Sequence, residues 1–299
     1  MKKLILFFFS LFVKMMTTSS NLLSSFAISL AYLKKKTNIF CSFLNTKKFL
    51  IKNKSYEGIK IKTSVSSFWD LHRINNFKDY PVRDIFFEKK FKKKIIFLEI
   101  GANTGMASLL VAKKFKNSQV YSLEFEPNTF LTLTQNIRIN NLTNVVPLCF
   151  GIAKEKSKKK FYYNLKYSSF NDENSIQSGC GGHSITFDKR NHHKKFFFSA
   201  IFTNYDALTN ALNLEIPTHI FIDAHGAEKD IILGMISTLY KKNVYKVYID
   251  TEEVKELNKL WVYKKMVSLG YALFNYNTTN YDNNLKSTSL IFKRAKFKN

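Results

Sequence analysis

The segment from residue 95 to residue 105 constrains the fold of this chain more than any other part of the sequence. It reads Ile-Ile-Phe-Leu-Glu-Ile-Gly-Ala-Asn-Thr-Gly, an apolar run too short to span a membrane that leads directly into two glycines four positions apart. A helical pattern that includes Leu109 and Leu110 opens at Met106. This arrangement is typical of a buried parallel strand that turns sharply under a ligand and feeds a helix whose N-terminus faces that ligand. The segment therefore predicts an α/β domain that binds a cofactor.

The rest of the chain alternates between strand and helix patterns. Such alternation implies parallel pairing through right-handed crossovers, and a closing strand–turn–strand predicts an antiparallel hairpin at one edge of the sheet. The fold class that we expect is a doubly wound, Rossmann-like α/β sheet, mostly parallel, with helices on both faces. The expected strands are residues 95–100, 120–125, 145–150, 219–223, 244–250, 271–276 and 287–292, and the expected helices are 106–116, 128–140, 228–240 and 254–269.

The length of the chain sets its domain organisation. With 299 residues, 45% of them hydrophobic, it can bury one large α/β core and still leave an N-terminal extension. We expect a hydrophobic and basic extension at 1–36, an accessory segment at 37–94 with two short strands, and the cofactor-binding domain at 95–299. A polar insert at 154–199, with strand-like ends around a loop rich in glycine, serine and asparagine, interrupts the alternation of the domain.

Two apolar runs lie near the N-terminus, and the first, residues 4–13, follows two lysines and is too short to span a bilayer. The second, residues 22–33, keeps its apolar residues on one helical face and ends at three lysines, a pattern typical of an interfacial helix at an anionic membrane surface or of a signal anchor. The first also suits the core of a signal peptide, and a loosely packed extension is a further alternative. Because nucleotide-type cofactors are made in the cytoplasm, we expect a cytoplasmic protein, peripheral to the inner membrane face or anchored there.

The formal net charge is +25, from 47 basic and 22 acidic residues. Such a charge attracts phosphates and anionic membranes. Lysine, asparagine, phenylalanine and isoleucine are abundant throughout, however, as a genome-wide codon bias would produce, so the charge alone does not identify a nucleic-acid partner. The cysteines Cys41, Cys149 and Cys180 have no paired spacing, which predicts neither a disulfide framework nor a metal site, and we expect Cys149 in the core.

The sequence of the turn selects among nucleotide cofactors. A dinucleotide-binding fold places Gly-x-Gly-x-x-Gly here, whereas this chain has Asn103 and Met106 in place of the second and third glycines. Asparagine tolerates the left-handed backbone that such a turn requires, but no cradle for a diphosphate is evident. The turn therefore suits a smaller cofactor with an amino-acid carboxylate, a ribose and a cationic sulfur.

Two acidic positions suit the other parts of such a cofactor. Backbone N–H groups at the turn and at the helix N-terminus can bind its carboxylate, and Glu99 can meet its ammonium group. Glu126 follows the next expected strand, where a carboxylate can accept hydrogen bonds from both ribose hydroxyls. Because Pro127 would start a helix, Glu126 is alternatively an ordinary acidic residue of a helix start. We expect Glu124 to point to the opposite face, with a structural role.

Four motifs, in this order and spacing, resemble the FkbM family of S-adenosylmethionine-dependent methyltransferases. They are Phe-Leu-Glu-Ile-Gly-Ala-Asn-Thr-Gly at 97–105, Leu-Glu-Phe-Glu-Pro-Asn at 123–128, the segment 136–141 and Phe-Ile-Asp-Ala-His-Gly-Ala-Glu at 221–228, and the resemblance covers about residues 95 to 293. It implies the seven-stranded sheet of class I methyltransferases, S-adenosylmethionine as cofactor, and O-methylation of a hydroxyl on a sugar, a glycan or a secondary metabolite. The cofactor-contacting positions that it implies are Glu99, Gly101, Ala102, Asn103, Gly105 and Glu126.

The acceptor side is expected outside the carboxyl ends of the strands, where Asp223, His225 and Glu228 fall. Methyl transfer is an in-line displacement in which alignment and exclusion of water supply most of the rate, while a base helps to remove the hydroxyl proton. We hypothesise that Asp223 or His225 is the base and orienting group, with Glu228 at the helix start. Alternatively, Asp223 and Glu228 only cap the turn and the helix. The chain departs from the family at His225, where the family usually has an acidic residue.

Three other functions compete with this interpretation. Adenine methyltransferases commonly carry Asp/Asn-Pro-Pro-Tyr after the fourth strand to stack a flipped base, whereas this chain has Asp-Ala-His-Gly at 223–226, so we do not expect a nucleic-acid acceptor. A nicotinamide-dependent oxidoreductase would need the third glycine of the turn. A non-catalytic, membrane-associated binding protein with the same fold is the third alternative.

Overall fold

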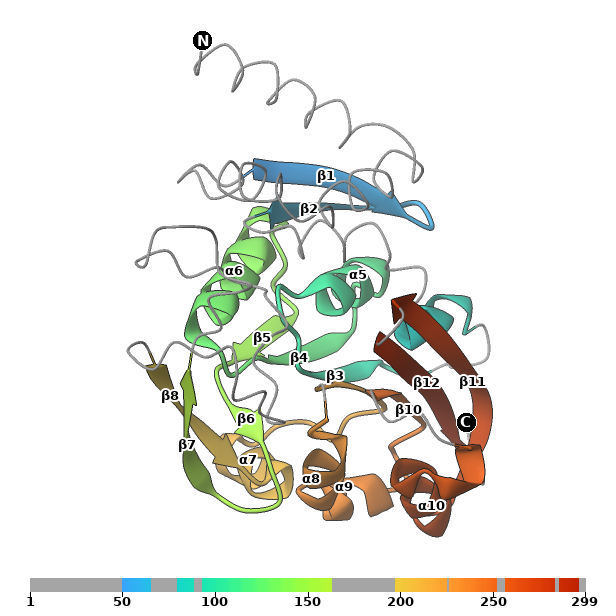
Figure 1. Ribbon diagram of the computed structural model, residues 1–299. Coiled ribbons are helices and arrows are strands. Elements are labelled where there is room, and N and C mark those ends of the chain that lie inside the picture. Colours follow the sequence, from blue (N-terminus) through green and yellow to red (C-terminus); the bar gives the residue numbers. More distant parts are fainter. Residues whose placement is uncertain are drawn as a thin grey trace.

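We analysed a computed structural model of the chain, which describes residues 50–65, 80–88, 93–162, 197–224, 226–251, 256–282 and 285–295. The expected membrane contact at 1–36, the glycine-rich loop of the insert and His225 lie outside the described residues. Element labels follow Figure 1.

A seven-stranded sheet forms the centre of the structure (Figure 1). Five strands run parallel, and β12 is antiparallel to both of its neighbours. The predicted mostly parallel sheet with helices on both faces is therefore confirmed. The order across the sheet is β11 (Tyr271–Asp282), β12 (Leu285–Arg294), β10 (Lys246–Thr251), β9 (His219–Asp223), β3 (Ile96–Ile100), β4 (Gln119–Leu123) and β5 (Val145–Leu148).

The closing hairpin lies at one edge of the sheet, as predicted; β11 is the outermost strand, and β12 lies between β10 and β11. Leu290, Ile291 and Phe292 of β12 are buried, whereas Phe274 and Tyr276 of β11 are each 54% exposed. The more apolar arm of the hairpin thus takes the interior place, since only an interior strand is covered on both faces.

Helices cover both faces of the sheet, as the alternation in β3 requires: Phe97 packs in one cluster, Leu98 and Ile100 in the other. One face carries α5 (Met106–Lys114) and α6 (Pro127–Ile139). The other carries α7 (Tyr205–Leu212), α8 (Glu228–Leu233), α9 (Ile236–Tyr240) and α10 (Trp261–Ser268).

Three helices differ from expectation. The sequence did not predict α7. The helix expected at 228–240 is interrupted at Gly234, where a Cβ atom would lie 2.1 Å from the carbonyl oxygen of Ala153, so a close approach of two backbones breaks it. The last helix begins at Trp261 instead of 254, after a short 3-10 turn, η3 (Leu257–Lys259), and residues 252–255 lie outside the described part of the chain.

The described part of the segment 37–94 packs on the α5–α6 face. It forms a hairpin of β1 (Leu50–Tyr56) and β2 (Ile59–Val65), followed by a 3-10 helix, η2 (Pro81–Phe87). Ile61 and Ile85 are buried in the same hydrophobic cluster as α5 and α6. This region is therefore part of the domain core.

A buried ion cluster fixes η2 to the central sheet. The side chain of Lys246, in β10, is 2% exposed and its Nζ donates to Asp84 Oδ2 at 2.5 Å and to Glu88 Oε2. The same Nζ lies 4.7 Å from the centre of the Phe274 ring of β11. Three elements distant in sequence thus meet at one lysine.

A small second sheet joins the two ends of the insert; its strand order is β6 (Gly151–Ile152), β8 (Phe197–Thr203) and β7 (Ser157–Tyr162). The strand-like ends predicted for the insert are β7 and β8, which pair antiparallel. Phe125, shortly after the end of β4, packs against the rings of Phe198 and Phe202 in β8 at centroid distances of 6.1 and 5.4 Å. The small sheet is therefore attached at the carboxyl end of β4. Cys149, expected in the core, is exposed, because β5 ends one residue earlier.

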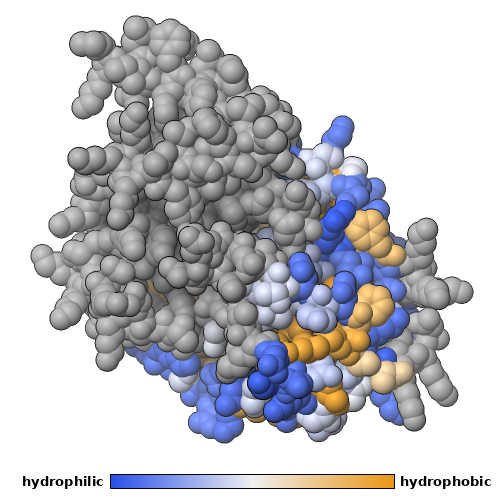
Figure 2. All heavy atoms as spheres, turned by 45° about the vertical axis from the view of Figure 1, so that its right-hand side comes forward, coloured by the Kyte–Doolittle hydropathy of each residue, from blue (hydrophilic) through white to orange (hydrophobic). Residues whose placement is uncertain are grey.

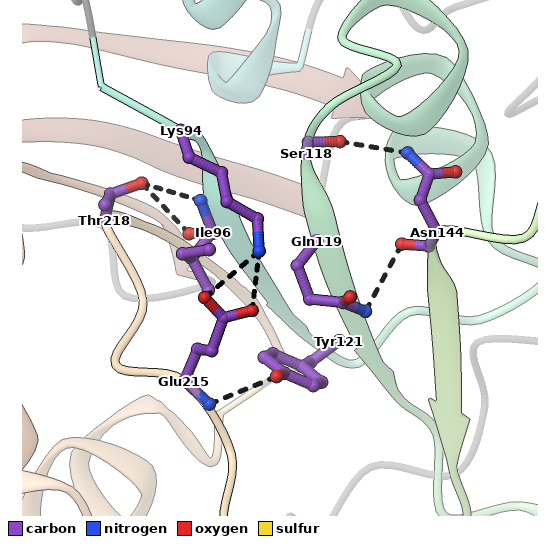
Figure 3. A network of polar contacts seen from close by, with 8 residues as sticks. All are labelled: Lys94, Ile96, Ser118, Gln119, Tyr121, Asn144, Glu215 and Thr218. Carbon is purple, nitrogen blue, oxygen red and sulfur yellow. Dashed lines mark hydrogen bonds and ion pairs between the residues drawn. The ribbon is translucent and has the colours of Figure 1, made fainter.

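The amino ends of the strands are closed by polar contacts between loops (Figure 3). The Thr218 hydroxyl bonds both backbone groups of Ile96, and Lys94 pairs with Glu215 at 2.8 Å. Asn144 bonds Ser118 across the start of β4 and β5 at 3.2 Å. The glycine-rich turn lies at the opposite, carboxyl edge, where ligands of such sheets bind.

On the side of the molecule that carries β11 and α10, hydrophobic side chains reach the surface among hydrophilic ones (Figure 2). Val267, Phe274 and Tyr276 are the large ones exposed on these two elements. Among the residues that the structure describes, no helix is both long and apolar enough to cross a membrane.

Candidate cofactor site

The turn between β3 and α5 has the left-handed geometry that its glycines and asparagine predict. The φ angles of Gly101, Asn103 and Gly105 are +83°, +52° and +90°. A Cβ atom on Gly101 would lie 2.0 Å from the carbonyl oxygen of Asp223, so the end of β9 contacts the turn where a side chain would otherwise stand. The absence of a side chain at Gly101 therefore lets two neighbouring strands end side by side.

Most amides of the turn are used within the protein. Gly101 and Ala102 both donate to the Leu123 carbonyl, at 3.0 and 2.8 Å. Asn103 donates to Glu124, and Gly105 donates to the Ala102 carbonyl, each at 2.9 Å or less. The turn is thereby fastened to the end of β4, and its own amides are not left for a ligand.

Two amides of the first turn of α5 are different. The N–H groups of Met106 and Ala107 donate no hydrogen bond within the described residues, although both residues are buried. A buried N–H group without a partner is costly, and the start of a helix favours negative charge. These two groups are therefore available for an anionic ligand such as a carboxylate.

Glu99 lies beside these amides. Its side chain is 3% exposed, and its Oε2 accepts hydrogen bonds from the amide of Ser108, at 2.9 Å, and from the Ser108 hydroxyl. Its Oε1 makes no hydrogen bond within the described residues. Burial raises the pKa of Glu99 to about 8; the bonds from Ser108 oppose this shift, and the charges of Asp223 and Glu124 add to it. A cationic ligand group would favour the ionised form.

Glu124 joins the two loops that follow β3 and β4. Its Oε2 accepts the amide of Asn103 and its Oε1 accepts the amide of Glu126, each at 2.9 Å. The prediction that it points to the opposite face is wrong, because these two amides draw the carboxylate into the turn. Its structural role is to hold Asn103 in place.

Glu126 caps helix α6. Its Oε1 accepts hydrogen bonds from the backbone and side chain of Asn128, at 3.1 and 3.2 Å, and its Oε2 accepts those of Thr129, both at 2.6 Å. Glu126 is thus an acidic residue of a helix start, the alternative considered from the sequence, because it accepts hydrogen bonds from the first amides of the helix. A ribose hydroxyl could bond the same carboxylate by replacing the amide group of the Asn128 side chain, the longest of these contacts.

Asp223 and Glu228 stand on either side of the β9–α8 turn. Asp223 ends β9, with its carboxyl group half-buried near Glu99. Glu228 is buried; its Oε1 accepts the amide of Gly226 at 2.8 Å and its Oε2 accepts the Thr251 hydroxyl at 3.3 Å. Glu228 therefore braces the turn and links it to β10. His225 lies outside the described residues.

These residues share one edge of the sheet. Four acidic residues lie at this edge in a protein whose net charge is +25: Glu99 inside β3, Glu124 and Glu126 after β4, and Asp223 at the end of β9. Such a local excess of negative charge suits a ligand that carries positive charge. Sequence reasoning missed the bond of Ser108 to Glu99 and the bonds of Asn136 to Thr104 and Ser64, because these contacts join segments that no local pattern connects.

The strand order, with the antiparallel β12 between β10 and β11, is that of the class I methyltransferase sheet implied by the sequence resemblance. The chain therefore has the Rossmann-like methyltransferase fold.

Part of the chain is similar in sequence to a known methyltransferase. A 165-residue segment is 24% identical to "Methyltransferase 1" of Beauveria bassiana and covers 51% of this chain and 65% of that protein, so the match spans less than two thirds of the relative. No protein-family model matches the chain, and the resemblance to the FkbM family stays a prediction.

Two solved structures illustrate the structural likeness. A precorrin-6y C5,15-methyltransferase from Geobacter metallireducens is similar with a TM-score of 0.39 and 12% identity, over 71% of this chain and 86% of that chain. The TYW2 protein of M. jannaschii, solved in complex with AdoMet, is similar with a TM-score of 0.40 and 13% identity, over 83% of this chain and 89% of that chain.

Proposed function

We propose that the protein is an S-adenosylmethionine-dependent methyltransferase. One observation carries this proposal: in the β3–α5 turn, Oε1 of Glu99 and the amides of Met106 and Ala107 lie together and form no hydrogen bond with any residue that the structure describes. An ammonium group and a carboxylate on one carbon atom, the amino-acid end of S-adenosylmethionine, would satisfy both. The similarity to a methyltransferase supports the same conclusion.

The cofactor would contact Glu99, Gly101, Ala102, Asn103, Gly105 and Glu126. Gly101 and Gly105 allow the chain to pass close to the ligand, and Asn103 supplies a left-handed residue between them. Glu126 would accept hydrogen bonds from the ribose. When bound, the cofactor supplies a methyl group activated by the positive sulfur.

The acceptor we propose is a hydroxyl of a sugar, a glycan or a secondary metabolite, as in the family that the sequence resembles. Asp223 or His225 would take the hydroxyl proton while the new O–C bond forms and the S–C bond breaks. Glu228, with its carboxylate bonded to Gly226 and Thr251, would hold the turn that carries these two residues. It would act as a positioning residue.

The function is tested by binding and turnover. In isothermal titration calorimetry, we expect the full chain to bind S-adenosylhomocysteine and not to bind NAD. Transfer of a labelled methyl group from S-adenosylmethionine would then be measured with sugars, glycans, small hydroxylated metabolites and transfer RNA. Failure to bind either sulfur cofactor would overturn the methyltransferase proposal. Labelling of RNA alone would replace the proposed acceptor with a nucleic acid, which the charge of +25 would also suit.

The two roles of Glu126 can be separated by substitution. Glu126→Ala should lower the stability of the domain by about 1 kcal/mol through loss of the helix cap, and should also weaken the binding of S-adenosylhomocysteine. Glu126→Asn keeps a good capping residue, so it should recover most of the stability while the affinity stays low. The free energy of unfolding in urea and the calorimetric dissociation constant measure the two effects. Wild-type affinity in Glu126→Asn would mean that the carboxylate serves only the helix.

The affinity for the cofactor should depend on pH through Glu99. In the fold, burial raises the pKa of Glu99 to about 8 from its ordinary value of 4.5. The carboxyl group therefore contributes its full stabilisation to the ligand-free fold below pH 4.5 and loses that contribution as the pH rises to 8. An ammonium group beside the carboxylate favours ionisation, so binding near pH 7 should release a proton and tighten between pH 6 and 8.

Calorimetry at pH 7 in two buffers with different ionisation enthalpies measures this proton release. Glu99→Gln is the control, since it keeps the shape of the side chain and cannot ionise; it should bind more weakly and release no proton. Equal proton release by the wild type and by Glu99→Gln would show that another group titrates.

A further inference from the structure

Asn136 of α6 connects the N-terminal hairpin with the cofactor turn. The residue is fully buried. Its Nδ2 donates to the carbonyl oxygen of Thr104 at 2.8 Å, and its Oδ1 accepts the amide of Ser64, in β2, at 2.7 Å. One side-chain amide thus bridges two backbone segments 40 residues apart in sequence. Only a side chain with both a donor and an acceptor can make these two bonds together.

A second asparagine, one helical turn later, holds the same hairpin without touching the cofactor turn. Asn140 accepts the amide of Lys62 at 2.8 Å and donates to the Lys62 carbonyl at 2.5 Å. Its Nδ2 also donates to the carbonyl of Asn136 at 2.8 Å. The two asparagines together pair with the free edge of β2 as a neighbouring strand would.

The orientation of the Thr104 carbonyl affects the direction of the amides that follow it in the turn. It lies between the left-handed residues Asn103 and Gly105, and directly before the two unbonded amides of Met106 and Ala107. Residues with positive φ keep that conformation only when their surroundings hold them there. The bond from Asn136 fixes the peptide plane between Thr104 and Gly105, and so the direction in which the following amides point.

We propose that Asn136 is a positioning residue of the cofactor turn and that the hairpin β1–β2 supports cofactor binding through it. This inference rests on the proposed function for the identity of the ligand. The hairpin thereby supports the binding site although it is not part of the central sheet. Coupling of this kind is reciprocal: a ligand at the turn strengthens the hold on the hairpin by the same factor as the hairpin strengthens ligand binding.

A pair of variants separates positioning from general stability. Asn136→Asp keeps the acceptor for Ser64 and replaces the donor to Thr104 with an oxygen atom; we expect the dissociation constant for S-adenosylhomocysteine to rise about tenfold, because one buried hydrogen bond is lost. Asn140→Ala removes the bonds to Lys62 but leaves both side-chain bonds of Asn136 in place, so it should keep the dissociation constant within about twofold. Calorimetry gives the affinities, and urea unfolding of the same proteins gives the stabilities. Equal loss of affinity in both variants, or none in Asn136→Asp, overturns the inference.

Hydrogen exchange of the ligand-free full chain keeps this result distinct from the proposed function. Asn136→Asp should speed amide exchange in residues 101–108, and Asn140→Ala should not. If the two variants differ in this way but the protein does not bind S-adenosylhomocysteine, Asn136 positions the turn and the proposed ligand is wrong. If the protein binds S-adenosylhomocysteine but the two variants do not differ, Asn136 does not position the turn. If Asn136→Asp does not fold, the inference is tested on the wild type. Binding of S-adenosylhomocysteine should slow hydrogen exchange of the Ser64 amide, and an unchanged rate overturns the inference.

Discussion

Replacing Gly101 with alanine is expected to lower the free energy of unfolding by at least about 3 kcal/mol and to abolish measurable cofactor binding. The new methyl group would lie 2.0 Å from the carbonyl oxygen of Asp223, a backbone atom that cannot rotate away. The φ angle of +83° adds the cost of a left-handed residue with a side chain, about 1–2 kcal/mol. Relief requires that β3 and β9 separate at their carboxyl ends, where the proposed cofactor and acceptor residues meet.

Gly58→Ala is the matched control. Gly58 has a similar φ angle of +77° in the β1–β2 turn, but nothing lies within 4 Å of its added Cβ atom. It should cost only about 1 kcal/mol, and cofactor binding should be unchanged. Urea unfolding and calorimetry with S-adenosylhomocysteine measure both variants. Similar losses for the two glycines would show that the contact with Asp223 relaxes at little cost, contrary to the close packing of the two strand ends.

Lys246→Ala is the second large effect, with an expected loss of about 3–5 kcal/mol in the free energy of unfolding. The side chain of Lys246 is 2% exposed, and that of its partner Glu88 is 10% exposed. Removal of the ammonium group leaves Asp84 and Glu88 beside one another without a counter-charge. Because these residues attach η2 to β10, the loss should appear first as faster hydrogen exchange in residues 81–87.

Two controls locate the cause of this loss. Lys94→Ala removes a lysine from an exposed pair, in which both side chains are 49% exposed, and should cost less than about 1 kcal/mol. The double variant Lys246→Met with Glu88→Gln should be more stable than Lys246→Met alone, because it removes an uncompensated carboxylate together with the lysine. If the double variant is no more stable than Lys246→Met, the loss of stability comes from packing of the lysine stem.

Local patterns predicted the cofactor half of the fold well. The strand His219–Asp223 has the bounds expected from its sequence, and the turn at 101–105 has the left-handed residues expected of Gly101, Asn103 and Gly105. Both are governed by short-range rules: a buried strand must be apolar throughout, and a sharp turn needs residues that tolerate positive φ. Glu99 was also placed at the turn from its position in the strand alone.

The errors and omissions all involve contacts between distant segments. The side chain of Glu124 was assigned to the wrong face because alternation along a strand ceases to apply once the strand ends, at Leu123. The order of β11 and β12 depends on which arm of the hairpin meets β10, and a hairpin pattern contains no such information. The bridge made by Asn136 joins three segments, so the periodicity of α6 could show that the residue faces inward but not what it bonds.

The packing of Phe125 against β8 has a consequence for how the insert can vary in length and sequence. Phe125 lies between Glu124 and Glu126, so the stem of the insert is clamped at the cofactor edge by the same short segment that holds the turn. Chain inserted between Tyr162 and Phe197 begins and ends at this fixed point, and doubling the length of such a loop costs only about 0.6 kcal/mol. The length and sequence of the chain between these two strands can therefore change without altering the segment that holds the turn.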